Sequence, residues 1–113
     1  MRGTEWVIDA HGCEAAALAD LTLLRSLFNR LIAELQLTPV ADPAWHVFAG
    51  TGGVTGFVML AESHVACHTF PELGTICLNV FCCRSRADWD AGRILAEIFG
   101  ARSVDVRRLE RVY

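Results

Sequence analysis

Apolar residues recur every three or four positions in two stretches of the chain, a spacing typical of amphipathic helices. In the first stretch these residues are Leu21, Leu24, Phe28, Leu31 and Leu35. The pattern predicts a helix from Asp20 to Leu35, with Asp20 as its N-cap. In the second stretch they are Ala91, Ile94, Leu95, Ile98 and Phe99. There we expect Ser85 or Asp88 to cap the helix and Gly100 to end it.

Runs of β-branched and aromatic residues, bounded by glycine and proline, predict strands between and around the two helices. The runs cover residues 6–10, 44–48, 54–61, 64–69, 75–82 and 103–112. Within them, Gly56 is expected to allow a close approach to the backbone. In the last run, Val104 and Val106 should point inward. The two prolines of residues 38–43 allow at most an edge strand there.

The order of these elements is strand, helix, several strands, helix and strand. It predicts an α/β fold, a two-layer α/β sandwich in which a mostly antiparallel sheet carries two helices on one face. With 113 residues, we expect a single domain, residues 1–113, that leaves much of its surface exposed. Hydrophobic residues make up 53% of the chain and charged residues only 20%, which favours a buried subunit interface.

The composition also excludes several classes of protein. All ten basic residues are arginine. Because a pyridoxal-phosphate enzyme and a phosphate-binding P-loop each need a lysine, both are excluded. The net charge of -3 and the lack of a basic patch give no reason to expect nucleic acid as a partner. No apolar run is long enough to span a membrane. Glu5 stands where a signal peptide would become apolar, so we expect a cytoplasmic protein.

The five cysteines give no sign of a metal site or of a disulfide framework. They stand at positions 13, 67, 77, 82 and 83, with no C-x-x-C pair and no zinc-ligand spacing, so we expect no metal. Cys13, Cys67 and Cys77 are interpreted as buried core side chains. Cys82 and Cys83 are adjacent in a predicted strand, so their side chains should point to opposite faces.

The candidate chemistry is concentrated in residues 60–72, which read Leu-Ala-Glu-Ser-His-Val-Ala-Cys-His-Thr-Phe-Pro-Glu. Ser63 lies between a carboxylate and an imidazole, and a second histidine, His68, begins the segment His-Thr-Phe-Pro-Glu. Followed by Cys83, this pattern resembles the bacterial S-adenosylmethionine decarboxylase proenzymes, which are pyruvoyl-dependent decarboxylases. The resemblance runs over nearly the whole chain and is strongest within residues 53–83.

The resemblance implies that the protein is made as a proenzyme and cleaves itself. The Ser63 hydroxyl attacks the carbonyl carbon of Glu62 to give an ester, since a hydroxyl can act as a nucleophile once its proton is removed. Loss of the Ser63 α-proton then eliminates the ester and breaks the chain. The remnant of Ser63 becomes a pyruvoyl group, the one cofactor that we expect. The products are a β chain, residues 1–62, and an α chain, residues 63–113.

By the same resemblance, five further residues receive roles. His68 is the processing base, because an imidazole moves protons near neutral pH, and Thr55 helps to polarise the reacting carbonyl. Cys83 returns a proton to the substrate after carbon dioxide has left. Glu72 binds the ribose of the substrate, and Phe48 stacks on its adenine. A structural reading also stays open: a mid-strand β-former for Thr55, a core aromatic for Phe48 and an exposed turn residue for Glu72.

Two histidines near this stretch receive no role. His64 follows Ser63 directly, and alternation along the strand is expected to turn its side chain away from the face of His68. His46 shortly precedes Phe48, and its role is left open.

The leading interpretation is a decarboxylase of S-adenosylmethionine in polyamine biosynthesis, a homodimer whose sites draw on both subunits. Val47, Phe70 and Asn79 depart from the family pattern around the substrate. Decarboxylation of L-ornithine or L-arginine on the same scaffold therefore stays an alternative. For those substrates, Glu5 and Asp9 lie on one face of the first strand and are candidates to bind the distal cation. A second alternative is an inactive paralogue that binds an active partner.

Overall fold

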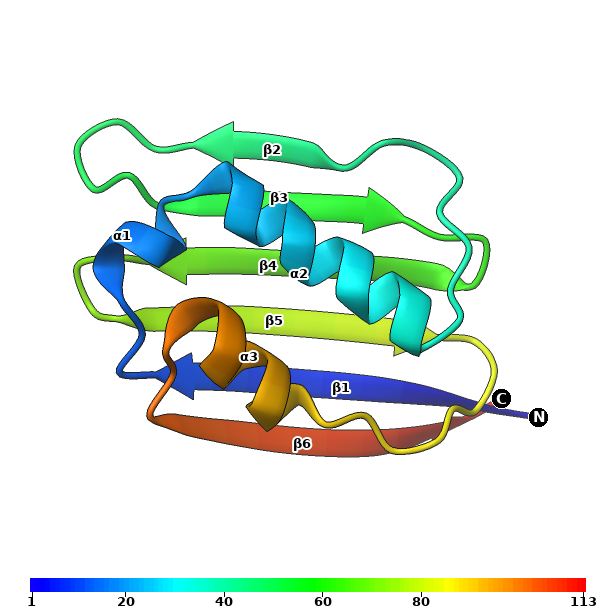
Figure 1. Ribbon diagram of the computed structural model, residues 1–113. Coiled ribbons are helices and arrows are strands. Elements are labelled where there is room, and N and C mark those ends of the chain that lie inside the picture. Colours follow the sequence, from blue (N-terminus) through cyan, green and yellow to red (C-terminus); the bar gives the residue numbers. More distant parts are fainter.

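The computed structural model describes residues 1–113 and contains one six-stranded sheet with three helices on one of its faces (Figure 1). The strands are β1 (Arg2–His11), β2 (Ala44–Val47), β3 (Val54–Met59), β4 (Ser63–Phe70), β5 (Thr75–Cys82) and β6 (Ser103–Val112). The helices are α1 (Ala15–Leu18), α2 (Leu21–Glu34) and α3 (Ala91–Phe99). The strand order is β2-β3-β4-β5-β1-β6, and every neighbouring pair is antiparallel. This confirms the predicted two-layer α/β fold.

The two long helices begin and end on identifiable signals. Asp20 caps α2 as predicted, because its carboxylate accepts hydrogen bonds from the backbone N–H groups of Thr22 and Leu23. For α3, the prediction of Ser85 or Asp88 was wrong. The N-cap is Asp90, which accepts from the backbone N–H of Arg93 at 3.1 Å. The sequence Ala-Asp-Trp-Asp offers two aspartates, and only the second directly precedes the helical turn.

Gly100 ends α3 in the left-handed conformation, with φ of 70°, where a side chain would be strained. The four-residue helix α1 was not predicted, because one turn is too short to show a helical period. None of the helices is long and apolar enough to cross a membrane.

Strand alternation divides each strand between the helix layer and the opposite side of the sheet. In β1, Trp6 and Ile8 are buried under the helices, whereas Glu5 and Asp9 lie on the other side. In Figure 1, α2 lies in front of β3 and β4, and α3 lies in front of β5 and β1. The largest fully buried side chains, from both layers, are Trp6, Phe28 and Phe99. The core therefore lies between the helices and one face of the sheet.

The side of the sheet away from the helices, called here the open face, is covered by nothing in the chain. It carries apolar side chains that would normally be buried, such as Phe57, Met59 and Leu109, which are 45%, 52% and 46% exposed. Cys77, which was expected in the core, is half-buried on this face beside Asp9. The prediction was wrong because alternation along β5 puts Cys77 on the same face as Asn79, away from the helices.

Three further expectations concern the strands and the segment before them. A Cβ atom on Gly56 would lie 2.3 Å from the indole ring of Trp45, so the predicted close approach is made by a side chain. In β6, Val104 packs against the core, but Val106 is 44% exposed because the helices do not cover this edge strand fully. Residues 38–43 form no strand, and their β-type pairing is an isolated bridge from Pro39 to Leu60.

Thr69 ties the helix layer to the sheet and gives a test of the fold. Its buried hydroxyl accepts from the Val54 N–H at 2.9 Å and donates to the Leu18 carbonyl at 2.8 Å. Thr69→Val keeps the shape but leaves both backbone groups buried without a partner, so it should lower the free energy of unfolding by about 2–4 kcal/mol in urea titrations. Thr69→Ser keeps the hydroxyl and should lose only about 1 kcal/mol. Equal stability of the two variants would contradict this role.

Candidate active site

The peptide bond between Glu62 and Ser63 lies in the tight turn that joins β3 to β4, and hydrogen bonds hold it on both sides. The carbonyl oxygen of Glu62 accepts from the backbone N–H of Cys83 at 3.0 Å. The carbonyl oxygen of Ser63 accepts from the backbone N–H of Leu60 at 2.9 Å. A donor fixed on the Glu62 carbonyl polarises that group and can stabilise negative charge on its oxygen.

The side chain of Glu62 is anchored as well, but to the connection that follows α2. Its two carboxylate oxygens accept from the backbone N–H and the hydroxyl of Thr38, at 2.9 and 3.0 Å. Burial acts to raise the pKa of Glu62, yet the hydrogen bonds from Thr38 outweigh it and hold the pKa below its ordinary value. Glu62 is therefore ionised near neutral pH, and the turn that contains the peptide bond is braced.

A line of hydrogen bonds runs from Ser63 across the open face to β6. The Ser63 Oγ lies 3.0 Å from His64 Nδ1, and His64 Nε2 lies 2.8 Å from Asn79 Oδ1. Asn79 Nδ2 donates to Glu5 Oε2 at 2.9 Å, and Arg111 donates to Glu5 Oε1 at 2.6 Å. The hydrogen bond from Asn79 and the adjacent Arg111 hold the pKa of Glu5 below its ordinary value. This network was not predicted, although strand alternation and register place His64, Asn79, Glu5 and Arg111 on one face.

The expectation that His64 points away from the face of His68 was wrong. The two residues are four positions apart in the regular strand β4, and an even separation returns a side chain to the same face. His64 accordingly lies on the open face, near the rings of Phe57 and Phe81.

Cys83 directly follows β5, next to the turn that contains Ser63. Its thiol is half-buried, whereas Cys82 is fully buried among core residues, so the predicted opposite orientation is found. Cys67 is also buried, which raises the pKa of its thiol to about 12. Burial, followed by the nearby carboxylate of Asp9, raises the pKa of Cys77. Cys83 is thus the accessible thiol beside the turn that contains the Glu62–Ser63 peptide.

A second cluster of polar and aromatic side chains lies at the other end of β4. Thr55 Oγ1 is 2.8 Å from His68 Nδ1, so these two predicted residues do meet. The His68 ring packs between Phe48 and Phe70, with ring centres 5.3 and 4.5 Å away. His46 adds a further edge contact to Phe48, at 4.7 Å. We call Thr55, His68, Phe48, Phe70 and His46 the aromatic cluster. Glu72 lies exposed in the turn that follows it.

The two groups of site residues are far apart in one chain. Ser63 begins β4 and His68 lies five residues later, which corresponds to about 17 Å in an extended strand. Hydrogen bonds to β3 and β5 on both sides keep that strand straight. Ser63 and Cys83 lie at the end of the sheet where the chain termini also lie, and His68 lies toward the opposite end (Figure 1). One chain therefore does not bring Ser63 and His68 together.

The carboxylates considered for a cationic substrate already have partners. Glu5 and Asp9 share the open face as predicted, but Arg111 lies 2.6 Å from Glu5 and Arg107 lies 2.7 Å from Asp9. Both arginines come from β6, the strand next to β1. A substrate ammonium or guanidinium group would have to displace them.

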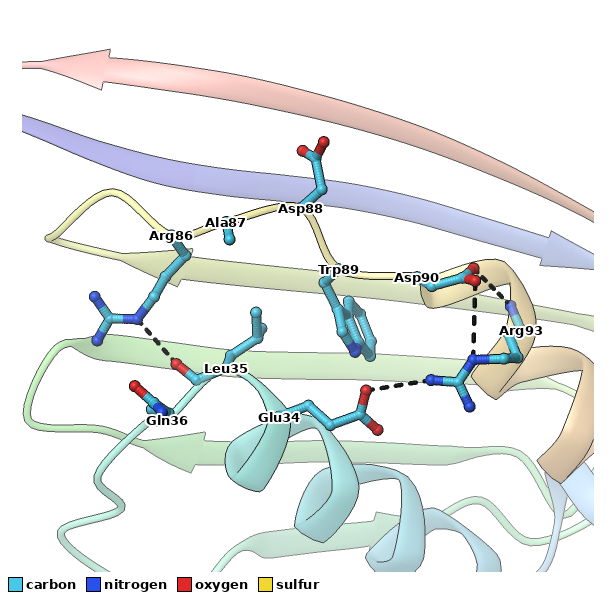
Figure 2. A pocket seen from close by; sticks show the side chains of 9 residues that line it. All are labelled: Glu34, Leu35, Gln36, Arg86, Ala87, Asp88, Trp89, Asp90 and Arg93. Carbon is cyan, nitrogen blue, oxygen red and sulfur yellow. Dashed lines mark hydrogen bonds and ion pairs between the residues drawn. The ribbon is translucent and has the colours of Figure 1, made fainter.

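The larger hollow in the molecule is remote from these residues. It has a volume of about 480 Å³ and lies between the end of α2 and the segment that leads into α3, on the helix side of the sheet (Figure 2). The arginines that line it are bound to their neighbours: Arg86 donates to the Leu35 carbonyl, and Arg93 pairs with Glu34 and Asp90. A shallower hollow of about 300 Å³ lies on the open face, between the Glu62–Ser63 turn and the aromatic cluster, over Ala66 and Cys77.

Comparisons with known proteins show the family of the chain. A family model described as S-adenosylmethionine decarboxylase matches residues 4–112. The chain belongs to the S-adenosylmethionine decarboxylase family. The family resemblance seen in residues 53–83 is thereby confirmed.

Individual members of the decarboxylase family are similar over almost the full chain. The S-adenosylmethionine decarboxylase proenzyme of Acetivibrio thermocellus is 34% identical, over 96% of this chain and 87% of its own length. The protein of the same name from Carboxydothermus hydrogenoformans is 34% identical, over 96% and 85%. The crystal structure of the adenosylmethionine decarboxylase from Aquifex aeolicus superposes with a TM-score of 0.80 at 25% identity, over 98% of this chain and 91% of that one.

Proposed function

We propose that this protein is a self-processing, pyruvoyl-dependent decarboxylase that converts S-adenosylmethionine to its decarboxylated form for polyamine biosynthesis. One observation carries the proposal. In a chain of this family, the Glu62 carbonyl accepts a hydrogen bond from the Cys83 N–H, and the hydroxyl of the next residue, Ser63, lies beside the His64 imidazole. The names of the relatives favour S-adenosylmethionine over ornithine or arginine and over an inactive paralogue. The expected cytoplasmic location stays a prediction.

The residues around the Glu62–Ser63 peptide fit the formation of a pyruvoyl group from Ser63. The turn that contains this peptide is called here the cleavage turn. The Ser63 hydroxyl attacks the Glu62 carbonyl carbon while the Cys83 N–H stabilises the oxygen. The ester that results loses the Ser63 α-proton to a base, for which His68 is the candidate, and the main-chain carboxylate of Glu62 leaves as the new end of the β chain. The dehydroalanine that remains at position 63 takes up water and loses ammonia, which gives the pyruvoyl group. The chain is then divided into a β chain, residues 1–62, and an α chain, residues 63–113. The pyruvoyl group supplies a carbonyl that binds the substrate amine and accepts electrons as carbon dioxide leaves.

The active site must draw on two chains, because Ser63 and His68 lie at opposite ends of one rigid strand. A two-fold axis through the middle of the open face would set the start of β4 in one chain over the end of β4 in the other. One site would then contain Ser63 and Cys83 of one chain with the aromatic cluster and Glu72 of its partner. The apolar side chains exposed on the open face support a homodimer of this kind, since such a patch is rarely left to solvent.

The remaining assigned residues act on the substrate. Cys83, half-buried beside the cleavage turn, holds a proton for the carbon from which carbon dioxide departs. Phe48 is 41% exposed, so a large part of its surface is free to stack on an adenine, and Glu72 is exposed in the following turn to bind the ribose hydroxyls. Glu5 and Asp9 are neutralised by arginines, which argues against a site built for ornithine or arginine.

The first test is self-cleavage. The wild-type protein should separate on a denaturing gel into fragments of residues 1–62 and 63–113, and intact mass should show the α chain beginning with a pyruvoyl group. Ser63→Ala removes the nucleophile and should remain one chain. A wild-type protein that stays whole after long incubation would refute the proposed function.

The second test asks whether the site is shared between chains. Ser63→Ala and His68→Ala chains should each remain uncleaved when expressed alone. When they are expressed together, mixed dimers contain one site with both Ser63 and His68, so the His68→Ala chain should be cleaved and the Ser63→Ala chain should not. Light scattering should give a dimer. Cleavage of the isolated His68→Ala chain at the wild-type rate would contradict a shared site.

The third test concerns the substrate and the proton donor. The processed enzyme should release carbon dioxide from S-adenosylmethionine, and turnover of ornithine or arginine alone would overturn the proposed substrate. Cys83→Ala should still cleave itself but should decarboxylate about 10²-fold more slowly, the typical loss when a general acid is removed. Cys82→Ala, which changes the neighbouring buried thiol, serves as the matched control and should keep far more activity. The reverse ranking would show that Cys82 is the donor.

A further inference from the structure

We propose that His64 is the base that removes the hydroxyl proton of Ser63 when Ser63 attacks the Glu62 carbonyl. The inference rests on the proposed self-cleavage and assigns its first proton transfer to a residue of the same chain. Hydrogen bonds link, in order, Ser63, His64, Asn79, Glu5 and Arg111. The donor and the acceptor of each bond can be assigned in only one way.

The direction is set at the Glu5 end of this line. Arg111 carries only donors, and its guanidinium lies 2.6 Å from Glu5. The pKa of Glu5 is lowered by its hydrogen bond from Asn79 and by Arg111, so Glu5 is a carboxylate that can only accept hydrogen bonds. The Asn79 atom that lies 2.9 Å from Glu5 must therefore be its NH₂ group. This fixes the orientation of the Asn79 amide.

The Asn79 amide in turn fixes the tautomer of His64. Its remaining polar atom, Oδ1, has no hydrogen and can only accept, so His64 Nε2 must carry the proton at the 2.8 Å contact. In the neutral imidazole, Nδ1 is then an unprotonated acceptor. Nδ1 lies 3.0 Å from the Ser63 Oγ, within hydrogen-bond reach of the proton that must be removed.

The His64 ring is held in place by packing as well as by hydrogen bonds. Phe57 stacks near it at 6.1 Å between ring centres, and Phe81 lies at 6.2 Å from the other side. His68 of the same chain is about 17 Å further along β4, and its Nδ1 is engaged by Thr55. Within one chain, His64 is thus the imidazole that contacts the reacting hydroxyl.

The conversion of the Glu62–Ser63 amide to an ester needs no further reactant, because His64 takes up one proton and later returns it. As the Ser63 Oγ forms its bond to the Glu62 carbon, the hydroxyl proton moves to His64 Nδ1 and the carbonyl electrons move to the oxygen that accepts from Cys83. When the carbonyl re-forms, the Glu62–Ser63 carbon–nitrogen bond breaks, and His64 returns the proton to the Ser63 nitrogen. The amide has become an ester by isomerisation, and His64 is again neutral.

The test uses freshly synthesised chains, whose cleavage is followed from the moment of translation. His64→Ala and His64→Gln should both cleave at least about 10²-fold more slowly than wild type, because neither can take a proton. Glutamine keeps a polar group near Asn79, so a purely structural role for His64 would leave His64→Gln close to wild type. His11→Ala, which changes an exposed histidine far from Ser63, is the control and should cleave normally.

Hydroxylamine identifies the step that is lost, because it cleaves esters rapidly and amides hardly at all. His64→Ala should remain whole in hydroxylamine, since its ester has not formed. A variant blocked after ester formation would instead be split before residue 63. A His64→Gln chain that cleaves at the wild-type rate, or a His64→Ala chain that hydroxylamine splits, overturns the inference. A wild-type chain that never cleaves refutes the proposed function itself, so the two failures are distinguishable.

Asn79 is a positioning residue in this scheme, and a double-mutant cycle tests its role. Asn79→Leu removes the acceptor for His64 Nε2 and should slow ester formation by about tenfold. If Asn79 acts through His64, the double variant His64→Ala/Asn79→Leu should cleave no more slowly than His64→Ala alone. Additive losses in the double variant would show that Asn79 acts independently and would overturn the positioning role.

Discussion

The straightness of β4 is the constraint on which the rest of the site depends. β4 is bonded on one side to β3 and on the other to β5 over nearly its whole length, so it cannot bend to bring its ends together. It begins with Ser63 and ends with the aromatic cluster. A sheet of this kind separates Ser63 from His68 as firmly as it positions each of them. The proposed function therefore includes a second copy of the chain, with the open face as the surface proposed for it.

The segment after α2 connects the scaffold to the cleavage turn. Thr38 clamps the Glu62 carboxylate and also accepts from the Ala61 N–H at 2.8 Å. Close by, the Leu35 carbonyl binds Arg86, which belongs to the loop that follows Cys83 (Figure 2). The end of α2 and the segment after it thereby hold the Glu62–Ser63 peptide. They also hold the loop after β5, next to the Cys83 N–H that donates to the Glu62 carbonyl. The hollow at this position lies between these elements, and the arginines that line it are engaged: Arg86 donates to the Leu35 carbonyl, and Arg93 pairs with Glu34 and Asp90.

The polar residues of the open face are joined in a row of side-chain hydrogen bonds that runs from His64 to Arg111. An amide at position 79 suits this setting. A carboxylate there would face Glu5 across the 2.9 Å that now separates Glu5 from the amide nitrogen, and two negative charges at that distance repel. Asn79 instead donates to Glu5 and accepts from His64. The departure of this residue from the family pattern is therefore compatible with an ordered site.

Much of the fold and part of the site could be predicted from the sequence, because they depend on local chemistry. The Asp20 cap and the helix that follows it are predicted from the sequence pattern, as are the strands from Thr75 to Cys82 and from Ser103 to Val112. The family motif indicated Thr55 and His68 as site residues, and the structure adds the contact between them. Strand alternation also places His64 on the face of His68, because the two residues are four positions apart, although the opposite face was predicted.

Only the tertiary structure decided which groups meet across strands and which do not. The contacts of Thr38 with Glu62 and of Arg111 with Glu5 join residues 24 and 106 positions apart, and no local pattern encodes such pairs. The sequence also placed Ser63 and His68 together in one motif, whereas the extended strand holds them apart. Sequence proximity sets the order of residues along β4, but the hydrogen bonds to β3 and β5 set the distance between them.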